Sequence, residues 1–374
     1  MLLIGNYPPD QQQSMQRFSA MVLQGLTAAG VPAELIRPEP VFGNLKLLGK
    51  FVAKWLGYVD KYVLFPRQLK RKLSAQTAVA HICDHSNAVY ARNCKPARVL
   101  VTCHDLLAVR GALGEETDCP ASFTGRILQR WILKALRRAD AIACVSDATA
   151  DDADRLVGHG PGQPQISVVR MGLNYPYKKL PIEIARARLV RVGKLNLDLP
   201  FVLHVGSNLR RKNRDGVIRI FAKCKEKWNG RLVFAGDLLN DELMSIAREL
   251  GVADRITQLE NPEGELLEAL YNCAIALLYP SRFEGFGWPI IEAQACGCPV
   301  ICSHSGPLPE AAGDAGLFNH VDDEDGFAAD VLRLRNPAER ADWSEKSLLN
   351  AERFSTGKMI AQYIDIYHSL EAKR

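Results

Sequence analysis

Short apolar runs rich in β-branched residues recur along the whole chain, and they do not alternate polar with apolar positions. Runs of this length without alternation predict parallel strands that are covered on both faces. In the first half they are "LLIGN" (2–6), "AELIR" (33–37), "AVAHIC" (78–83), "RVLVTC" (98–103), "DAIACV" (140–145) and "QISVVR" (165–170). In the second half they are "PFVLHVG" (200–206), "GRLVFAG" (230–236), "RITQL" (255–259), "AIALLYP" (274–280), "CPVIC" (298–302) and "AGLF" (315–318).

Helical patterns lie between most of these runs. In "SMQRFSAMVLQGLTAAG" (14–30), one face carries Phe18, Met21, Val22, Gly25 and Leu26, and the pattern ends at a glycine, as helices often do. Strands that alternate with helices predict right-handed crossovers and a doubly wound parallel sheet. The pattern occurs twice, so the predicted fold class is α/β with two such sheets.

The boundary between the two domains is predicted in "NYPYKKLP" (174–181), where two prolines and two tyrosines interrupt both periodicities. We therefore expect an N-terminal domain over 1–178 and a C-terminal domain over 179–358. The amphipathic end of the chain predicts a helix over 359–374 that packs back on the N-terminal domain. Ligands of open α/β sheets bind beyond the carboxyl ends of the strands, so we expect the two sheets to face a cleft.

Composition narrows the class of protein. A chain of 374 residues with 47% hydrophobic residues can bury two cores of ordinary size. No run approaches the roughly 18 apolar residues of a membrane-spanning helix, and "MLLIGNYPPD" lacks a basic leader with a cleavage site. We expect a cytoplasmic protein that is neither secreted nor membrane-spanning.

The ten cysteines are scattered, and those at 83, 103 and 144 fall in predicted strands, where a free thiol behaves as a small apolar group. A reducing compartment follows from this usage. Three further cysteines and a histidine lie close together, namely Cys296, Cys298, Cys302 and His304. Their spacing is not that of an ordinary zinc site, so buried thiols around a turn are favoured over a metal site.

Charge is distributed unevenly along the chain. The net charge is +9 over residues 1–187 and −4 over residues 188–374. Residues 44–73 carry eight Lys and Arg with one acid, and residues 126–138 carry five with none, in both cases between apolar residues. Basic amphipathic segments suit the surface of an anionic membrane. The alternative is that the apolar faces belong to the core and the basic side chains are merely solvated. Nucleic acid is not favoured as a partner, because no binding module is recognisable.

The loop "HVGSNLRRKN" (204–213) leaves the first strand of the second half. It offers Gly206, Ser207 and then a basic run with Arg211 and Lys212 that leads into a helix. Backbone amides, a helix N-terminus and cations at one strand end suit a diphosphate. The alternative is a solvated basic helix start. Neither a dinucleotide fingerprint nor a P-loop motif is present.

A second loop, "SRFEGFGWPIIEAQACGCPV" (281–300), follows a later strand of the same sheet. Its glycines allow close backbone approach, and Pro289 suits the first turn of a helix. Glu284 precedes that helix and Glu292 lies about one turn inside it. Carboxylates repel phosphate but accept hydrogen bonds from sugar hydroxyls. Together with the basic loop they indicate a nucleotide sugar. The alternative is a solvated loop acid at 284 and a helix acid at 292 that the macrodipole favours.

The first half contributes its own strand-end residues. His104 and Asp105 follow the run at 98–103, and Ser146 follows the run at 140–145, where its alternative role is that of a helix N-cap. Gly172 suits a tight turn before the domain boundary.

These residues resemble those of retaining glycosyltransferase family 4, whose members have the two-Rossmann-domain architecture called GT-B. The resemblance spans nearly the whole chain: "HD" (104–105), "VSD" (145–147), "MGLN" (171–174), "RKN" (211–213), the two glutamates at 284 and 292, "GCPV" (297–300) and "GPLPE" (306–310). Two glutamates separated by seven residues, with "FG" between them, are the most specific of these motifs.

The resemblance implies a role for each matching position. Arg211 and Lys212 would hold the donor diphosphate and stabilise the leaving group, with Gly206 and Ser207 beside them. Glu284 would bind hydroxyls of the donor sugar, and Glu292 those of the ribose. The backbone of Phe286, Gly287 and Trp288 would contact the donor. His104 would contact the transferred sugar, and the loop after Leu259 would line the edge of the site for the base. Many members have a Gly-Gly pair in the first loop, where this chain has Gln13 and Ser14 as the acceptor or phosphate loop. The residue at 288 is commonly aliphatic, and no role for Trp288 follows.

The implied reaction is transfer of a hexose, of mannose or glucose type, from a nucleotide diphosphate sugar to a glycan or lipid-linked acceptor in bacterial surface polysaccharide or glycolipid synthesis. Front-face attack with retention needs no protein nucleophile; a covalent intermediate on Glu284 is the alternative. We expect no metal and no cofactor beyond the donor, because cations already neutralise the leaving group. A nucleotide-sugar epimerase and a non-catalytic nucleotide-sugar sensor are the competing functions.

Overall fold

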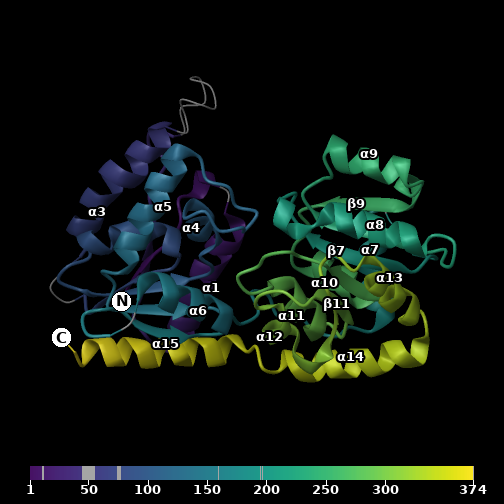
Figure 1. Ribbon diagram of the computed structural model, residues 1–374. Helices are drawn as coiled ribbons and strands as arrows, with labels where there is room; N and C mark the ends of the chain where they lie inside the picture. Colours follow the sequence, from purple (N-terminus) through teal and green to yellow (C-terminus); the bar gives the residue numbers. More distant parts are fainter. Residues whose placement is uncertain are drawn as a thin grey trace. The chain divides into compact units, whose positions relative to one another are not determined.

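The computed structural model describes residues 1–10, 12–43, 55–73, 77–158, 160–193, 195 and 197–373. Its internal contacts divide the chain into two compact units (Figure 1). Unit 1 comprises Met1–Asn174 and Thr356–Arg374, and unit 2 comprises Tyr175–Ser355. The chain thus leaves unit 1 within the "NYPYKKLP" stretch and returns to it before its last helix.

Unit 1 is built on a parallel six-stranded sheet with the order β2-β1-β3-β4-β5-β6. Its strands are β1 (Leu2–Ile4), β2 (Glu34–Ile36), β3 (Val79–Ile82), β4 (Arg98–Cys103), β5 (Ala141–Cys144) and β6 (Gln165–Val168). Its helices are η1 (Pro8–Asp10), α1 (Gln13–Ala28), the π-helix η3 (Asp60–Leu64), α3 (Phe65–Lys72), η4 (His85–Asn93), α4 (Leu107–Ala112), α5 (Phe123–Leu136), α6 (Asp147–Val157) and α15 (Thr356–Glu371).

Unit 2 has a second parallel six-stranded sheet, in the order β12-β11-β10-β7-β8-β9. Its strands are β7 (Phe201–Gly206), β8 (Arg231–Gly236), β9 (Ile256–Glu260), β10 (Ala276–Tyr279), β11 (Val300–Ser303) and β12 (Gly316–Asn319). Its helices are α7 (Ile182–Val190), η5 (Arg210–Lys212), α8 (Arg214–Cys224), α9 (Asp241–Glu249), η6 (Ala253–Arg255), α10 (Glu265–Cys273), α11 (Trp288–Ala295), α12 (Leu308–Ala312), η7 (Gly313–Ala315), α13 (Glu324–Arg333) and α14 (Pro337–Ala351).

The predicted α/β class with two doubly wound sheets is confirmed, since each of the twelve apolar runs overlaps one strand. The central strands are buried on both faces because helices cover both sides of each sheet, which explains the missing alternation. The predicted end of the first helix is also confirmed: Gly30 follows α1 with φ at +73°, a conformation that glycine adopts without a steric penalty. No helix among the described residues has the length and apolar character needed to cross a bilayer.

Helix α15 packs on unit 1 and covers one face of its sheet. A hydrogen-bonded network joins the two: the ring nitrogens of His81 contact the hydroxyls of Tyr367 (2.8 Å) and Thr102 (2.7 Å), and Thr102 contacts Tyr363 (2.9 Å). All four side chains are buried, so each polar group finds its partner inside the protein. This network specifies where α15 lies on the sheet.

Gly172 serves a close approach to α15 and not the tight turn that the sequence suggests. Its φ is outside the left-handed region. A Cβ at this position would lie 2.5 Å from the Cα of Thr356, so any larger residue would displace the start of the helix.

Candidate functional site

The strongest candidate site lies at the carboxyl edge of the sheet in unit 2, where β7 and β10 are neighbours. The loop after β7 and the loop after β10 are joined by several hydrogen bonds, two of which involve the backbone and Asn213. The amide of Arg282 donates to the carbonyl of Arg211 (2.8 Å), and the side-chain amide of Asn213 donates to the carbonyl of Pro280 (3.0 Å). Asn213 is buried with φ at +54°, a conformation that asparagine tolerates better than most residues. The two sequence motifs therefore form one structural unit.

Glu284 is the centre of this unit. Its Oε2 accepts a hydrogen bond from Arg211 (2.6 Å), and its Oε1 accepts one from Lys212 (2.6 Å) and one from the Tyr279 hydroxyl (2.7 Å). Lys212 also donates to that hydroxyl (2.8 Å). Only 6% of the Glu284 side chain is exposed, so the interpretation as a solvated loop acid is wrong. We refer to Arg211, Lys212, Tyr279 and Glu284 as the 284 cluster.

The cluster fixes the charge state of Glu284. Burial alone would raise the pKa of this carboxyl, but the charges of Lys212 and Arg211 and the hydrogen bonds outweigh it and lower the pKa from 4.5 to about 2. Burial lowers the pKa of Lys212, and the charge of Glu284 opposes that effect. Glu284 is therefore a carboxylate at neutral pH that cannot donate a proton.

Glu292 lies in α11, which begins directly after Gly287. The φ of that glycine is +107°, where a side chain would be strained, and Pro289 occupies the predicted place in the first turn. Glu292 is buried and accepts a hydrogen bond from the Tyr271 hydroxyl (2.9 Å). It is thus held in the interior by a specific partner, which the macrodipole interpretation does not require. Trp288 is the first residue of α11 and is half-buried.

The other residues predicted to contact the donor differ in how far they are buried. Phe286 is buried, with its ring edge-to-face against Phe354 at 5.7 Å between centroids. Gly206 ends β7, and Ser207 after it is half-buried. Leu259 is buried inside β9, which ends at Glu260, so the loop expected to edge the base begins at Asn261, two residues after Leu259.

Arg214, the first residue of α8, is a member of the site that the sequence reasoning missed. It is buried and donates to the carbonyl of Gly206, to the carbonyl of Asp237 (2.7 Å) and to the side chain of Asn208 (2.7 Å). Burial lowers its pKa to about 10. Through these hydrogen bonds, Arg214 stabilises the loop after β7 from its buried side. The sequence does mark Arg214 as the end of the basic run "RRKNR". It does not indicate that this side chain is buried.

In unit 1, His104 follows β4 and is nearly covered. Its Nε2 donates to the carbonyl of Cys83 (2.9 Å), and its ring lies edge-to-face on Phe18 with centroids 4.7 Å apart. Burial lowers its pKa, so the neutral imidazole is favoured. Asp105 accepts a hydrogen bond from the amide of Leu107, the first residue of α4 (3.1 Å). Contact of His104 with a sugar stays a prediction.

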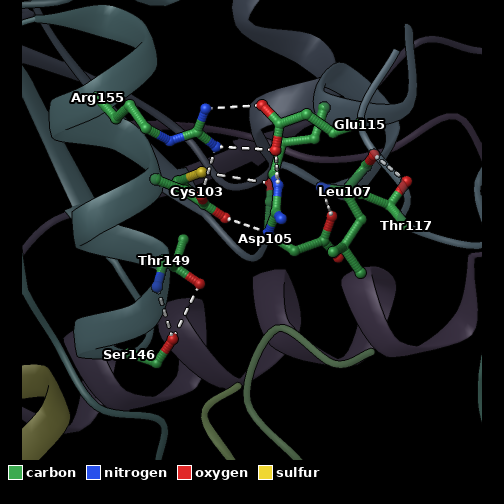
Figure 2. A network of polar contacts seen from close by, with 10 residues as sticks. Cys103, Asp105, Leu107, Glu115, Thr117, Ser146, Thr149 and Arg155 are labelled. Carbon is green, nitrogen blue, oxygen red and sulfur yellow. Dashed lines mark hydrogen bonds and ion pairs between the residues drawn. The ribbon is translucent and has the colours of Figure 1, made fainter. Parts of the chain in front are cut away.

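A ring of ion pairs holds the segment that follows His104 (Figure 2). Arg110 contacts Glu115 (2.7 Å) and Asp152 (2.9 Å), and Arg155 contacts the same two carboxylates (2.6 and 2.9 Å). Thr117 adds a hydrogen bond to the carbonyl of Leu107 (3.1 Å). The ring ties α4 and its following loop to α6, which fixes the strand end that carries His104.

Ser146 has the alternative role considered for it. Its hydroxyl accepts a hydrogen bond from the amide of Thr149 (3.1 Å) and so caps α6, as Figure 2 shows.

Sequence reasoning also missed a polar group at the ends of β1 and β3. The carboxylate of Asp84 accepts hydrogen bonds from the side-chain amide of Asn6 (2.5 Å), the hydroxyl of Ser86 (2.6 Å) and the amide of Ser86 (3.0 Å). The same amide of Asn6 donates to Gln12 (2.5 Å). The pair "DH" at 84–85 after one strand mirrors "HD" at 104–105 after the next, a signal that could have drawn attention to it.

The expected loop position of Gln13 and Ser14 is wrong. Both lie exposed in the first turn of α1, because the helix begins one residue earlier than its apolar periodicity indicates. The glutamine that reaches the strand end is Gln12, through Asn6.

The cysteines near the turn at 297 are buried free thiols, as favoured from the sequence. Burial raises the pKa of Cys296, Cys298 and Cys302. His304 packs its ring against Phe318. Across the described ranges, no three His, Cys, Asp or Glu side chains gather as metal ligands would.

Comparisons with known proteins agree with this geometry. Residues 186–348 match the model of the family described as Glycosyl transferases group 1. Among curated relatives, the O-antigen chain mannosyltransferase B of Escherichia coli is 29% identical over 254 residues, 66% of this chain and 65% of that protein. A D-inositol 3-phosphate glycosyltransferase of Acidothermus cellulolyticus is 29% identical over 290 residues, 73% of this chain and 62% of that protein. The matches thus span less than two thirds of the length of these relatives.

Solved structures share the fold. A sucrose-phosphate synthase from Thermosynechococcus elongatus has a TM-score of 0.74 at 21% identity, covering 100% of this chain and 99% of that one. The Anabaena protein HepE, solved in complex with UDP and glucose, has a TM-score of 0.72 at 17% identity, covering 98% and 99%. The architecture is therefore that of GT-B glycosyltransferases, and residues 186–348, which contain the 284 cluster, match the family of glycosyl transferases group 1.

Proposed function

We propose that this chain transfers a hexose from a nucleotide diphosphate sugar to a glycan or lipid-linked acceptor, with retention at the anomeric carbon. The observation that carries the proposal is the 284 cluster, which combines two cations and an ionised carboxylate at the carboxyl edge of a parallel sheet. Cations suit the diphosphate and a carboxylate suits sugar hydroxyls, so one cluster addresses both parts of the donor.

The contacts of Glu284 suggest how the donor enters. Without a donor, its two oxygens are occupied by Arg211, Lys212 and Tyr279. The phosphate oxygens compete for the same two cations, and the carboxylate oxygens released by this exchange accept hydrogen bonds from the sugar. Lys212 and Arg211 then stabilise the charge that develops on the departing phosphate. Glu292 takes the ribose hydroxyls, and no metal takes part in this scheme.

The acceptor side of the proposal rests on unit 1 and on the relatives. His104 contacts the transferred sugar, and Asn6, Gln12 and Asp84 offer hydrogen-bonding groups at neighbouring strand ends. The mannosyltransferase relative is named for O-antigen chains, which favours surface polysaccharide or glycolipid synthesis at the inner face of the cytoplasmic membrane.

A panel of UDP, GDP and ADP sugars tests the donor. A sugar nucleotide that binds only the folded chain at about 100 times its dissociation constant stabilises it by about 2.7 kcal/mol, which raises the melting temperature by roughly 5 °C or more for a unit of this size. Release of free nucleotide only when an acceptor is present would distinguish transfer from epimerisation and from mere sensing. The proposal fails if no sugar nucleotide shifts the melting temperature.

Helix α5 supports contact with an anionic membrane surface. Phe123 (79% exposed) and Ile127 (56% exposed) lie one turn apart on it, and the helix carries Arg126, Arg130 and Lys134 without any acid. Its opposite face, with Ile132 and Leu136, is buried in the core. The buried face agrees with the interpretation that the segment belongs to the core, and the exposed face supports the proposed contact with a membrane. In the other basic segment, residues 44–54 lie outside the described residues, and Trp55 is exposed.

Replacing Phe123 and Ile127 together by serine is expected to reduce co-flotation with vesicles containing anionic lipid at least several-fold at low salt, because two large apolar side chains no longer enter the interface. The matched control is Leu349→Ser, which removes an apolar side chain of similar exposure (62%) from α14. Equal flotation of the double variant and the unchanged chain would contradict the proposed surface.

A further inference from the structure

His204 is a buried histidine beneath the 284 cluster to which the scheme above gives no task. It lies in β7 with no exposed surface, and its ring packs between Phe234 and Tyr279, at centroid distances of 5.5 and 6.1 Å. Tyr279 is the residue whose hydroxyl contacts both Lys212 and Glu284. An apolar residue would fill this position equally well, so the presence of an imidazole calls for an explanation.

The hydrogen bonding of His204 leaves one nitrogen unused. Its Nδ1 donates to the carbonyl of Leu278 (2.9 Å), and since a carbonyl can only accept, Nδ1 carries the proton of the neutral ring. Nε2 is then a lone-pair acceptor, and within the described part of the chain it is buried without a partner. A buried polar atom without a partner is costly and uncommon in native proteins.

Nε2 faces the place where the donor diphosphate is proposed to lie. A Cβ built on Gly206 would be 3.4 Å from Nε2 and 3.6 Å from Cδ of Lys212. Because Gly206 has no side chain, both Nε2 and the stem of Lys212 approach its backbone from the same side at the end of β7. The charged groups around the ring are Lys212 from η5, Arg214 from α8 and Glu284 from the loop after β10.

The imidazole is neutral in the absence of a ligand. Burial, followed by the charge of Arg214, lowers the pKa of His204 to about 3. The hydrogen bond to Leu278 opposes this effect, Lys212 adds to it, and Glu284 opposes it least. The charge of a bound diphosphate acts in the opposite direction. At an effective dielectric constant of about 20, one negative charge roughly 6 Å away raises the affinity for a proton about 100-fold, so two charges are sufficient to bring His204 close to half protonation at neutral pH.

We propose that His204 takes up one proton at Nε2 when the diphosphate of a nucleotide sugar binds at Gly206, and that the resulting imidazolium positions this diphosphate from beneath. The proton comes from hydronium or the buffer acid, whose bond to it breaks as the Nε2–H bond forms, and no bond of the ligand changes. The inference rests on the proposed function, because it requires a diphosphate at the end of β7. It makes His204 a positioning residue for the donor and makes donor binding depend on pH.

The test is isothermal titration calorimetry of the full chain with GDP-mannose and with UDP-glucose in two buffers of different ionisation enthalpy. Each phosphate of such a sugar has one ester linkage, one anhydride linkage and one acidic oxygen that stays ionised between pH 6 and 8, so an uptake of protons belongs to the protein. We expect uptake approaching one proton per ligand at pH 6, and an association constant about tenfold higher at pH 6 than at pH 8, as one-proton linkage requires.

His204→Gln is expected to abolish the proton uptake and to flatten the pH dependence, and His204→Phe, which keeps a ring against Tyr279, serves if the first variant does not fold. His320→Gln is the control, because His320 is an exposed histidine in the same unit (78% exposed side chain) and should leave the uptake unchanged. The same uptake in both His204 variants as in the unchanged chain, or binding without uptake in the unchanged chain, would overturn the inference alone. If the unchanged chain binds neither of these two sugars nor any other sugar nucleotide of the panel, the proposed function fails and the inference with it.

Discussion

Replacing Lys212 by methionine is expected to lower kcat/KM for the donor by about 100- to 1,000-fold, the range measured when one group that stabilises a developing negative charge is removed. Methionine keeps the length and the apolar stem of lysine but removes the ammonium that contacts Glu284 at 2.6 Å and Tyr279 at 2.8 Å. Most of the loss should appear in kcat, because the charge on the leaving phosphate is largest in the transition state.

The matched control is Lys223→Met on α8. Lys223 lies at the surface and forms an ion pair with Asp325, so its removal changes the net charge of the same unit without touching the site. Initial rates at varied donor concentration, with circular dichroism to verify folding, decide the outcome. A change of less than threefold in kcat/KM for a folded Lys212→Met variant would exclude Lys212 from the reaction.

The free energy of unfolding is expected to fall as the pH drops below 6.5, and His81 should contribute to this loss together with His204, whose pKa is also lowered to about 3. Burial, followed by the charge of His104, lowers the pKa of His81 from 6.5 to about 3 in the folded chain. Between these values the unfolded chain binds the proton and the folded chain does not, so stability is complete above pH 6.5 and is lost as the pH falls toward 3. One such histidine contributes about 1.4 kcal/mol per pH unit in this window.

His81→Phe is expected to reduce this dependence by that amount, although at pH 7 it also destabilises the chain by about 1 to 3 kcal/mol, because Thr102 and Tyr367 each lose a buried partner. Urea unfolding at pH 7, 6 and 5 measures the slope separately from the offset, above the range in which carboxyl groups titrate. His320→Phe, at an exposed site, should leave the slope unchanged. An equal slope in His81→Phe would show that other groups cause the acid sensitivity.

Much of the fold was predictable because it depends on apolar periodicity, a property of the sequence alone. A strand covered on both faces must be apolar throughout, so "RVLVTC" marks β4 without knowledge of its neighbours. The start of α1 was less predictable, since Gln13 and Ser14 are exposed and carry no apolar signal.

For the candidate site, the sequence predicts which residues lie at the ends of strands. The sequence places Arg211, Lys212 and Glu284 in loops at one edge of a sheet, and the structure brings them together. The sequence does not predict that these residues pair with one another. The direction of their side chains depends on backbone geometry, such as the left-handed conformation of Asn213. Arg214 was missed for a related reason: its burial depends on acceptors that lie in other loops, among them the carbonyl of Asp237.

The position of α15 has a consequence for how the protein is made. Unit 1 is interrupted in sequence by the whole of unit 2. During translation, residues 356–371 are therefore synthesised long after the strands of the sheet on which they pack. At ordinary rates of synthesis this delay is about 10 to 40 s. Throughout that interval His81 and Thr102 lack the tyrosine partners that α15 provides. Unit 2 is continuous in sequence and can reach its native state first, so the nascent chain is expected to acquire its second sheet domain before its first is complete.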